Sequence, residues 1–156
     1  MLAPDWEYVA DTVMGGVSRG RLTQETIAGR PAARLTGAVS LENDGGFVQM
    51  AFDLSADGGP IDASSWHGID MDVFGNGETY ELRLRTTRLT RPWQSFRAPF
   101  VAPAEWTTIR VPFATLDAHR TEADFDPAEL RRIGIVAIGR EFAADVAVSD
   151  IRFYAE

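Results

Sequence analysis

The stretch GIDMDVFGNGETYELRLRTT, residues 68–87, decides the fold. Apolar and polar side chains alternate on both sides of the central Gly75-Asn76-Gly77. Such alternation is typical of a β-strand with one buried face, and Asn-Gly is the strongest signal for a two-residue turn. We therefore predict a β-hairpin that pairs Gly68–Phe74 with Thr79–Thr87.

The register of this hairpin assigns its side chains to two faces. Ile69, Met71, Val73, Tyr80, Leu82 and Leu84 form the predicted core face. On the outer face, Asp70 is expected opposite Arg83, a favourable charge pair, and Asp72 opposite Glu81, a like-charge pair.

Period-two alternation continues along the rest of the chain, broken at short intervals by Gly, Pro, Asn and Asp. The other predicted strands are Gly20–Glu25, Ala33–Leu41, Phe47–Leu54, Gln94–Val101, Thr107–Phe113, Arg132–Ile138 and Val146–Tyr154. This spacing predicts an all-β sandwich of two antiparallel sheets. One short helix is expected at Ala128–Arg131, with Asp126 as N-cap and Pro127 at its first position. We expect a single domain over residues 1–156.

Composition excludes several classes of protein. The 156 residues include no cysteine, which excludes thiol nucleophiles, disulfide scaffolds and iron–sulfur or cysteine-bound zinc sites. All 15 basic residues are arginine, against 23 acidic ones, and the net charge of −8 argues against nucleic acid as a partner. The chain has no secretory signal and no apolar run long enough to span a membrane. We expect a cytoplasmic protein.

The later strands extend the outer face of the hairpin. Alternation places Trp93 and Arg97 outward, and likewise Trp106 and Arg110. If these strands neighbour the hairpin, arginines and tryptophans gather on one sheet face, and both residue types are enriched at binding hot spots. The alternative is that the tryptophans cap the core edge and the arginines pair with nearby carboxylates.

Motifs for catalysis or metal binding fail on their context. Gly16-Val17-Ser18-Arg19-Gly20 matches a nucleophile elbow, but no parallel sheet precedes it and no helix follows. Asp70, Asp72 and Glu81 match part of a calcium loop of the EF-hand type, yet their flanks alternate like strands. A calcium site of another kind on these carboxylates remains open. We predict no enzyme activity, no cofactor and no metal.

Two glycine pairs, Gly15-Gly16 and Gly45-Gly46, each precede a predicted strand. Glycine permits positive φ and close backbone approach. The adjacent Asp11, Ser18 and Asn43 are expected either to hydrogen-bond the two loops to each other or to line a pocket.

The segments DTVMGGVS (residues 11–18) and GAVSLENDGGF (residues 37–47) strongly resemble the complex I intermediate-associated protein family. Similar stretches follow in order, including YELRLRT (residues 80–86) and VPF (residues 111–113), so the resemblance spans nearly the whole chain. It implies a galactose-binding-like jelly-roll β-sandwich. For mitochondrial members it also implies an assembly factor of respiratory NADH:ubiquinone oxidoreductase that binds intermediates without catalysis. The chain matches the bare domain, so we expect a bacterial member.

These observations predict a non-enzymatic binding protein that grips a protein partner, such as respiratory-complex subunits, through one sheet face and its rim loops. The predicted contact residues are Arg83, Arg85, Trp93, Arg97 and Trp106, and the predicted loop-organising residues are Asp11, Ser18, Asn43 and Phe47. The alternative is a carbohydrate- or small-ligand-binding module on the same face. A concave face with exposed Trp93 favours sugar, whereas a flat apolar patch favours protein.

Overall fold

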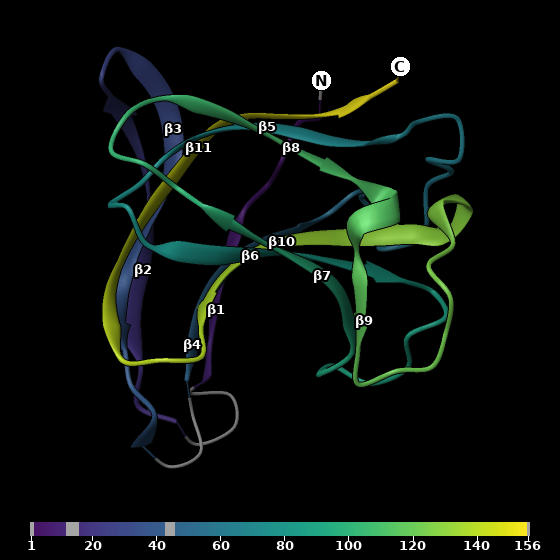
Figure 1. Ribbon diagram of the computed structural model, residues 1–156, viewed down its shortest axis with the longest axis horizontal. Coiled ribbons are helices and arrows are strands. Elements are labelled where there is room, and N and C mark those ends of the chain that lie inside the picture. The colour runs from purple at the N-terminus through teal and green to yellow at the C-terminus, as the bar shows by residue number, and fades with distance from the viewer. Residues whose placement is uncertain (1, 12–15, 43–45, 156) are drawn as a thin grey trace.

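Side-chain alternation gives nearly every strand one buried and one outer face. The computed structural model describes residues 2–11, 16–42 and 46–155, and these form two antiparallel sheets packed face to face (Figure 1). The six-stranded sheet, here sheet A, has the order β1–β4–β10–β6–β7–β9. The five-stranded sheet B has the order β2–β3–β11–β5–β8.

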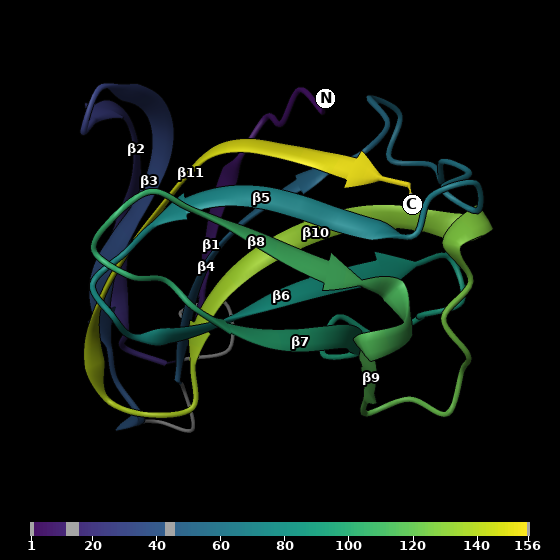
Figure 2. The ribbon, with the colours of Figure 1, turned by 45° about the horizontal axis from the view of Figure 1, so that its top comes forward.

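The strands of sheet A are β1 (Glu7–Ala10), β4 (Phe47–Asp53), β10 (Leu130–Ile138), β6 (Thr79–Thr86), β7 (Ser95–Val101) and β9 (Asp117–His119). The strands of sheet B are β2 (Arg19–Ile27), β3 (Arg30–Val39), β11 (Phe142–Tyr154), β5 (Gly68–Phe74) and β8 (Thr107–Pro112). In Figure 2, β11, β5 and β8 form the upper layer and β10, β6 and β7 the lower layer.

The core lies between the two layers. Leu82 and Leu84 of β6 meet Ile69 and Met71 of β5 in one cluster, and all four are fully buried. Burial of each such side chain contributes about 1.5–3 kcal/mol of hydrophobic free energy. Because these residues occupy alternate positions, the residues between them point away from the core, and this fixes the outer face of each sheet.

The predicted hairpin is wrong. Both strands form, but β5 pairs with β11 and β8 in sheet B, whereas β6 pairs with β10 and β7 in sheet A. The turn at Asn76 instead carries the chain from one sheet to the other, and the Tyr80 hydroxyl donates to Asn76 Oδ1 at 2.6 Å. Alternation determines which face of a strand is buried, but it does not determine which strands are its neighbours. The same alternation therefore fits two strands of one hairpin and two strands that lie in facing sheets.

The other predicted strands are confirmed to within a few residues, and β1 and β9 were not predicted.

The predicted helix is confirmed at its start only. Asp126 accepts a hydrogen bond from the Ala128 amide at 3.0 Å, but η4 (Pro127–Glu129) is a single 3₁₀ turn and Leu130 already belongs to β10. A second 3₁₀ turn, η3 (Phe113–Thr115), follows β8. The described residues contain no helix long and apolar enough to cross a membrane.

Candidate functional site

The outer face of sheet A is hollowed into a cleft of about 520 Å³. It is lined by Val9, Phe47, Gln49, Ala51, Arg83, Arg85, Pro92, Trp93, Gln94, Ser95, Arg132 and Gly134. Three central strands, β4, β10 and β6, supply the floor, and the segment between β6 and β7 supplies one wall.

Small residues keep the floor of the cleft low. Gly134 of β10 pairs in register with Ala51 of β4 on one side and with Arg83 of β6 on the other. A Cβ atom at Gly134 would lie 3.0 Å from Oε1 of Gln49. The missing side chain therefore leaves room for a ligand above the middle of the sheet.

The segment that carries Trp93 is held by two side chains. Nη1 of Arg85 donates to the carbonyl oxygens of Arg91 at 2.9 Å, Pro92 at 3.3 Å and Gln94 at 2.5 Å. The Gln94 side chain in turn accepts from the Arg91 amide at 3.1 Å. The indole of Trp93 nevertheless stays 53% exposed at the rim. An aromatic side chain on a segment ordered in advance loses little conformational entropy on binding.

Arginines dominate the polar lining. Arg83 donates through Nε and Nη2 to Oε1 of Glu81 at 2.9 and 2.7 Å, and Arg97 lies 3.6 Å from the other oxygen. Arg132 donates to Asp53 at 2.8 Å and also to Glu7. Arg85, by contrast, has no carboxylate partner among the described residues.

The arginines set a positive field over this face. Burial, assisted by the neighbouring Arg131 and Arg132, lowers the pKa of Arg85. Burial and then the charges of Arg97 and Arg83 lower the pKa of His119 on β9. Burial also opposes the charge of Arg132, but its hydrogen bonds to carboxylates outweigh that cost and raise its pKa. The cleft is thus locally cationic in an acidic chain.

The opposite wall begins at a buried carboxylate, Asp11. Its oxygens accept from the Ser18 amide at 3.0 Å, the Ser18 hydroxyl at 2.5 Å, the Gly46 amide at 2.6 Å and the Phe47 amide at 3.3 Å. Burial alone would raise the pKa of Asp11, but these hydrogen bonds lower it. Asp11 therefore ties the N-terminal segment to the start of β4 and fixes Phe47 in the cleft wall.

Most of the predicted contact residues come together. Arg83, Arg85, Trp93 and Phe47 line the cleft, and Arg97 pairs in register with Arg83 beside it. Asp11 and Ser18 connect the two segments by hydrogen bonds, which is one of the two expectations for them: Asp11 accepts from the Gly46 and Phe47 amides, and Ser18 accepts from the Ser40 amide. Asn43 lies outside the described residues.

Trp106 does not lie on this face, so that part of the predicted surface is wrong. Its strand, β8, pairs with β5 in sheet B. The indole nitrogen donates to the Ile27 carbonyl at 2.9 Å, and the ring meets Phe74 at 5.6 Å between centroids. Arg110 leaves the predicted surface for the same reason and pairs with Asp70 at 2.8 Å.

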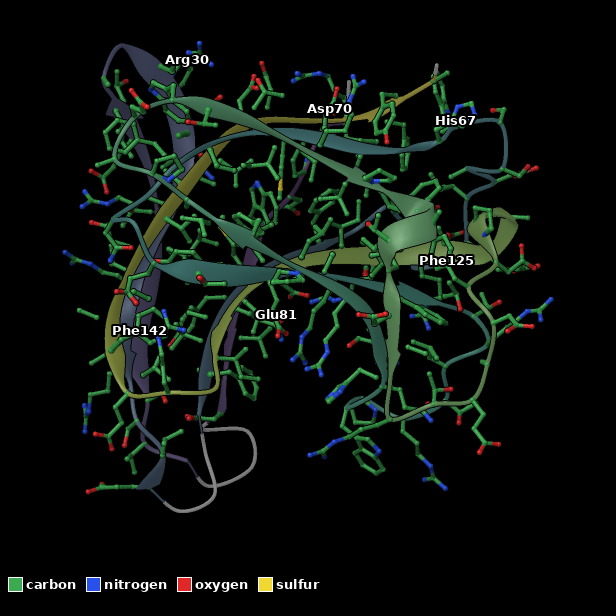
Figure 3. The ribbon with its side chains drawn as sticks, viewed as in Figure 1. Arg30, His67, Asp70, Glu81, Phe125 and Phe142 are labelled. Carbon is green, nitrogen blue, oxygen red and sulfur yellow. The ribbon has the colours of Figure 1, made fainter. Side chains whose placement is uncertain are left out.

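The calcium alternative also fails. Asp70 and Glu81 lie on opposite sides of the molecule, because they belong to different sheets (Figure 3). Asp72 accepts from Thr108 at 2.5 Å and from Arg152 at 3.3 Å. Within the described ranges no three acidic or histidine side chains gather as metal ligands. Ser18, the serine of the elbow motif, is 1% exposed and bonded to Asp11.

A comparison with known families agrees with the resemblance that residues 11–18 and 37–47 carry. The model of the family described as complex I intermediate-associated protein 30 matches residues 2–147. The chain belongs to this family. A search of curated proteins gives no match.

Several solved structures that are similar to this family member are carbohydrate-binding modules. The family 11 module of the cellulosomal cellulase Lic26A-Cel5E of Clostridium thermocellum has a TM-score of 0.79 at 11% identity, covering 100% of this chain and 90% of the module. A family 11 module from the same organism, in complex with a β-1,3-1,4-mixed-linked tetrasaccharide, has a TM-score of 0.77 at 12% identity, covering 97% and 89%. A family 30 module of cellulase Cel9D-Cel44B, also from that organism, has a TM-score of 0.72 at 16% identity, covering 99% and 94%. At this identity the likeness shows the fold, a galactose-binding-like jelly-roll β-sandwich.

Sequence reasoning missed several lining residues of this complex I intermediate-associated domain, and Gln49, Arg132 and Gly134 are the ones on the floor that matter most to the cleft. Each sits on a strand that was predicted, next to at least one buried residue that faces the core. The same alternation that placed Arg83 outward would have placed them outward as well, but nothing in the sequence put β4 and β10 next to β6.

Proposed function

We propose that this chain is a non-catalytic binding domain that holds a protein partner in the cleft of sheet A, during assembly of respiratory NADH:ubiquinone oxidoreductase. The observation that carries the proposal is Trp93, which stays exposed on a segment fixed by Arg85. Tryptophan and arginine are the residues most often found at the centre of protein interfaces. We further propose that the sandwich acts as one domain in the cytoplasm.

The shape of the cleft refines this proposal. A concave surface of this size cannot take the flat face of a folded protein, but it accommodates an extended segment of a partner. Phe47 and Trp93 stand on opposite walls and offer apolar contact to such a segment, while Nε and Nη2 of Arg85 offer a pair of donors to it.

The lining supports binding and not catalysis. No acidic, histidine or cysteine side chain is among its described lining residues. His119 pairs with Ser95 in register, but the buried Ser95 hydroxyl forms no hydrogen bond to any described residue. Nucleophilic and acid–base catalysis both need such a pair within hydrogen-bond reach.

Affinity capture from the native host, followed by mass spectrometry, tests the proposal. We expect respiratory-complex subunits with the wild-type chain and their loss with Arg83→Ala/Arg85→Ala. The matched control is Arg30→Ala/Arg152→Ala, which removes two arginines from sheet B. Equal recovery with both double variants would contradict the proposal.

Carbohydrate binding in the same cleft is the second candidate. The specific observation in its favour is concavity together with the exposed Trp93, the arrangement that favours sugar over protein. The similar carbohydrate-binding modules support this candidate by fold alone. A glycan array and a thermal-shift screen separate the two, because a ligand that binds only the native state raises its melting temperature.

A further inference from the structure

Arg85 carries a positive charge that the described residues leave uncompensated. Its Nη1 is fully used by three carbonyl oxygens, whereas Nε and Nη2 donate to no described residue. The side chain is half-buried in the lining of the cleft, and its pKa is lowered by burial and by Arg131 and Arg132. A partly buried guanidinium without a counter-charge favours any anion that reaches it.

Positive charge is in excess on the side of the cleft that contains Arg85. On β6 and β7, Arg83 and Arg97 share one carboxylate partner, Glu81, and Arg85 has no carboxylate partner among the described residues. Asp117 of β9 pairs in register with Arg97 but is not within ion-pair distance of it. The lowered pKa of His119, caused by burial and then by Arg97 and Arg83, agrees with a cationic field there.

The other side of the cleft has a different character. Val9 of β1 and Phe47 and Ala51 of β4 give an apolar wall. Arg132, which stands between the two sides, is neutralised by Asp53 and Glu7. The cleft therefore presents a cationic wall and an apolar wall on its two sides.

An extended polypeptide matches this arrangement, because its successive side chains point to opposite sides. We propose that the cleft binds an extended peptide segment in which acidic and apolar side chains alternate, with one carboxylate on Nε and Nη2 of Arg85 and the apolar side chains against the wall of Phe47. The inference rests on the proposed function and specifies the chemistry of the segment that the partner inserts.

Fluorescence polarisation with defined peptides tests this chemistry. The probe is a fluorescein-labelled octapeptide that alternates glutamate with leucine, and its control alternates glutamine with leucine. We expect the glutamate peptide to bind about tenfold more tightly, because one charge-assisted hydrogen-bond pair typically accounts for that factor. The difference is expected to shrink when NaCl rises from about 50 to about 300 mM, since salt screens exposed charges.

Two variants separate the role of the charge from the role of Arg85 in holding the Trp93 segment. Arg85→Gln is expected to weaken binding of the glutamate peptide about tenfold more than that of the glutamine peptide. Glu81→Gln frees Arg83 and Arg97 from their shared carboxylate and is expected to tighten the glutamate peptide about threefold or more, with no change for the glutamine peptide. Arg30→Gln on sheet B is the matched control and should change neither affinity.

Equal affinity for the two peptides, or an equal loss of both in Arg85→Gln, would overturn the inference. So would tighter binding of tetragalacturonic acid, a carboxylate-bearing sugar, than of the glutamate peptide. If one of these results is obtained while the capture of respiratory-complex subunits still depends on Arg83 and Arg85, it overturns this inference alone. If the capture of respiratory-complex subunits does not depend on Arg83 and Arg85, the result counts against the proposed function instead.

Discussion

The outer faces of the two sheets both carry arginine and carboxylate side chains, but these side chains are paired differently on the two faces. On sheet B, Arg110 holds Asp70 through two hydrogen bonds of 2.8 and 2.9 Å, and Arg34 holds Asp145 through two of 2.9 and 2.7 Å. On sheet A, Arg83 and Arg97 share Glu81 as their carboxylate partner, Arg85 has none among the described residues, and the surface is hollowed. Arginine by itself therefore does not identify a binding face.

The difference lies in how completely each face satisfies its own charges. A guanidinium that already has a bidentate carboxylate partner has little left to offer a ligand, and removing its partner costs stability. A guanidinium held by carbonyl oxygens keeps its net charge. In the proposed function, the outer face of sheet B serves stability and that of sheet A binds the partner, and each of the following predictions tests one side of this contrast.

The largest effect is expected from Trp93→Ala. Truncation of an aromatic hot spot typically costs about 2–4 kcal/mol of binding, so recovery of the partner should fall more than tenfold. The free energy of unfolding should change by less than about 0.5 kcal/mol, because Trp93 is exposed. Capture from extract and urea unfolding measure the two quantities. Full recovery of the partner would remove Trp93 from the binding surface.

The complementary variant on sheet B is Asp70→Ala. It leaves Arg110 without its bidentate carboxylate, and we expect a loss of about 1–3 kcal/mol in the free energy of unfolding. Partner recovery, measured at a temperature where the variant is folded, should be unchanged. A variant that folds as well as wild type but loses its partner would reverse the roles of the two faces.

Filling the floor of the cleft should separate shape from charge. Gly134→Leu places a side chain over the middle of sheet A, where only the end of the Gln49 side chain has to move. We expect loss of partner recovery with a stability change of no more than about 1 kcal/mol, since the added side chain points away from the core. Binding that survives this variant would place the ligand elsewhere on the molecule.

Acid sensitivity should also differ between the faces, with the smallest effect. The hydrogen bonds from Arg110 lower the pKa of Asp70, although burial opposes this shift. The ionised Asp70 side chain therefore stabilises the fold fully above the ordinary pKa of aspartate, about 3.9. This stabilisation is lost as the pH falls through the lowered pKa of Asp70 in the folded protein. Burial and the nearby arginines lower the pKa of His119, so stability declines as pH falls below the ordinary histidine pKa of about 6.5. His119→Gln should flatten the stability profile below about pH 6.5, down to the lowered folded pKa of His119, and Asp70→Asn should flatten only the acidic end of the profile. Urea midpoints measured across pH test both, and the opposite pattern would contradict the assignment.

The alternation of apolar and polar residues was sufficient to predict which face of each strand is buried, but it did not predict the order of the strands in the sheets. Alternation correctly separated Leu82 and Leu84 from Arg83 and Arg85, because the side-chain period of a strand is fixed by its geometry. It misplaced Trp106 and Arg110, since their position depends on β8 joining β5 in sheet B.

The same reasoning explains the rest of the cleft. Asp11 and Ser18 were found because two glycine pairs marked segments able to approach each other, and hydrogen bonds connect these two segments. Gly134 and Arg132 were missed because only the neighbouring strands make them part of a cleft. Long-range strand order is decided by packing of the whole core and leaves little trace in any one segment.

One pair of variants tests the central claim most directly: Arg85→Gln on sheet A and Arg110→Gln on sheet B, each assayed for partner capture and for the free energy of unfolding. The account predicts that Arg85→Gln loses the partner while remaining folded, and that Arg110→Gln keeps the partner but is less stable. Loss of the partner with Arg110→Gln and its retention with Arg85→Gln, in folded proteins, would contradict the claim that the cleft of sheet A is the binding face.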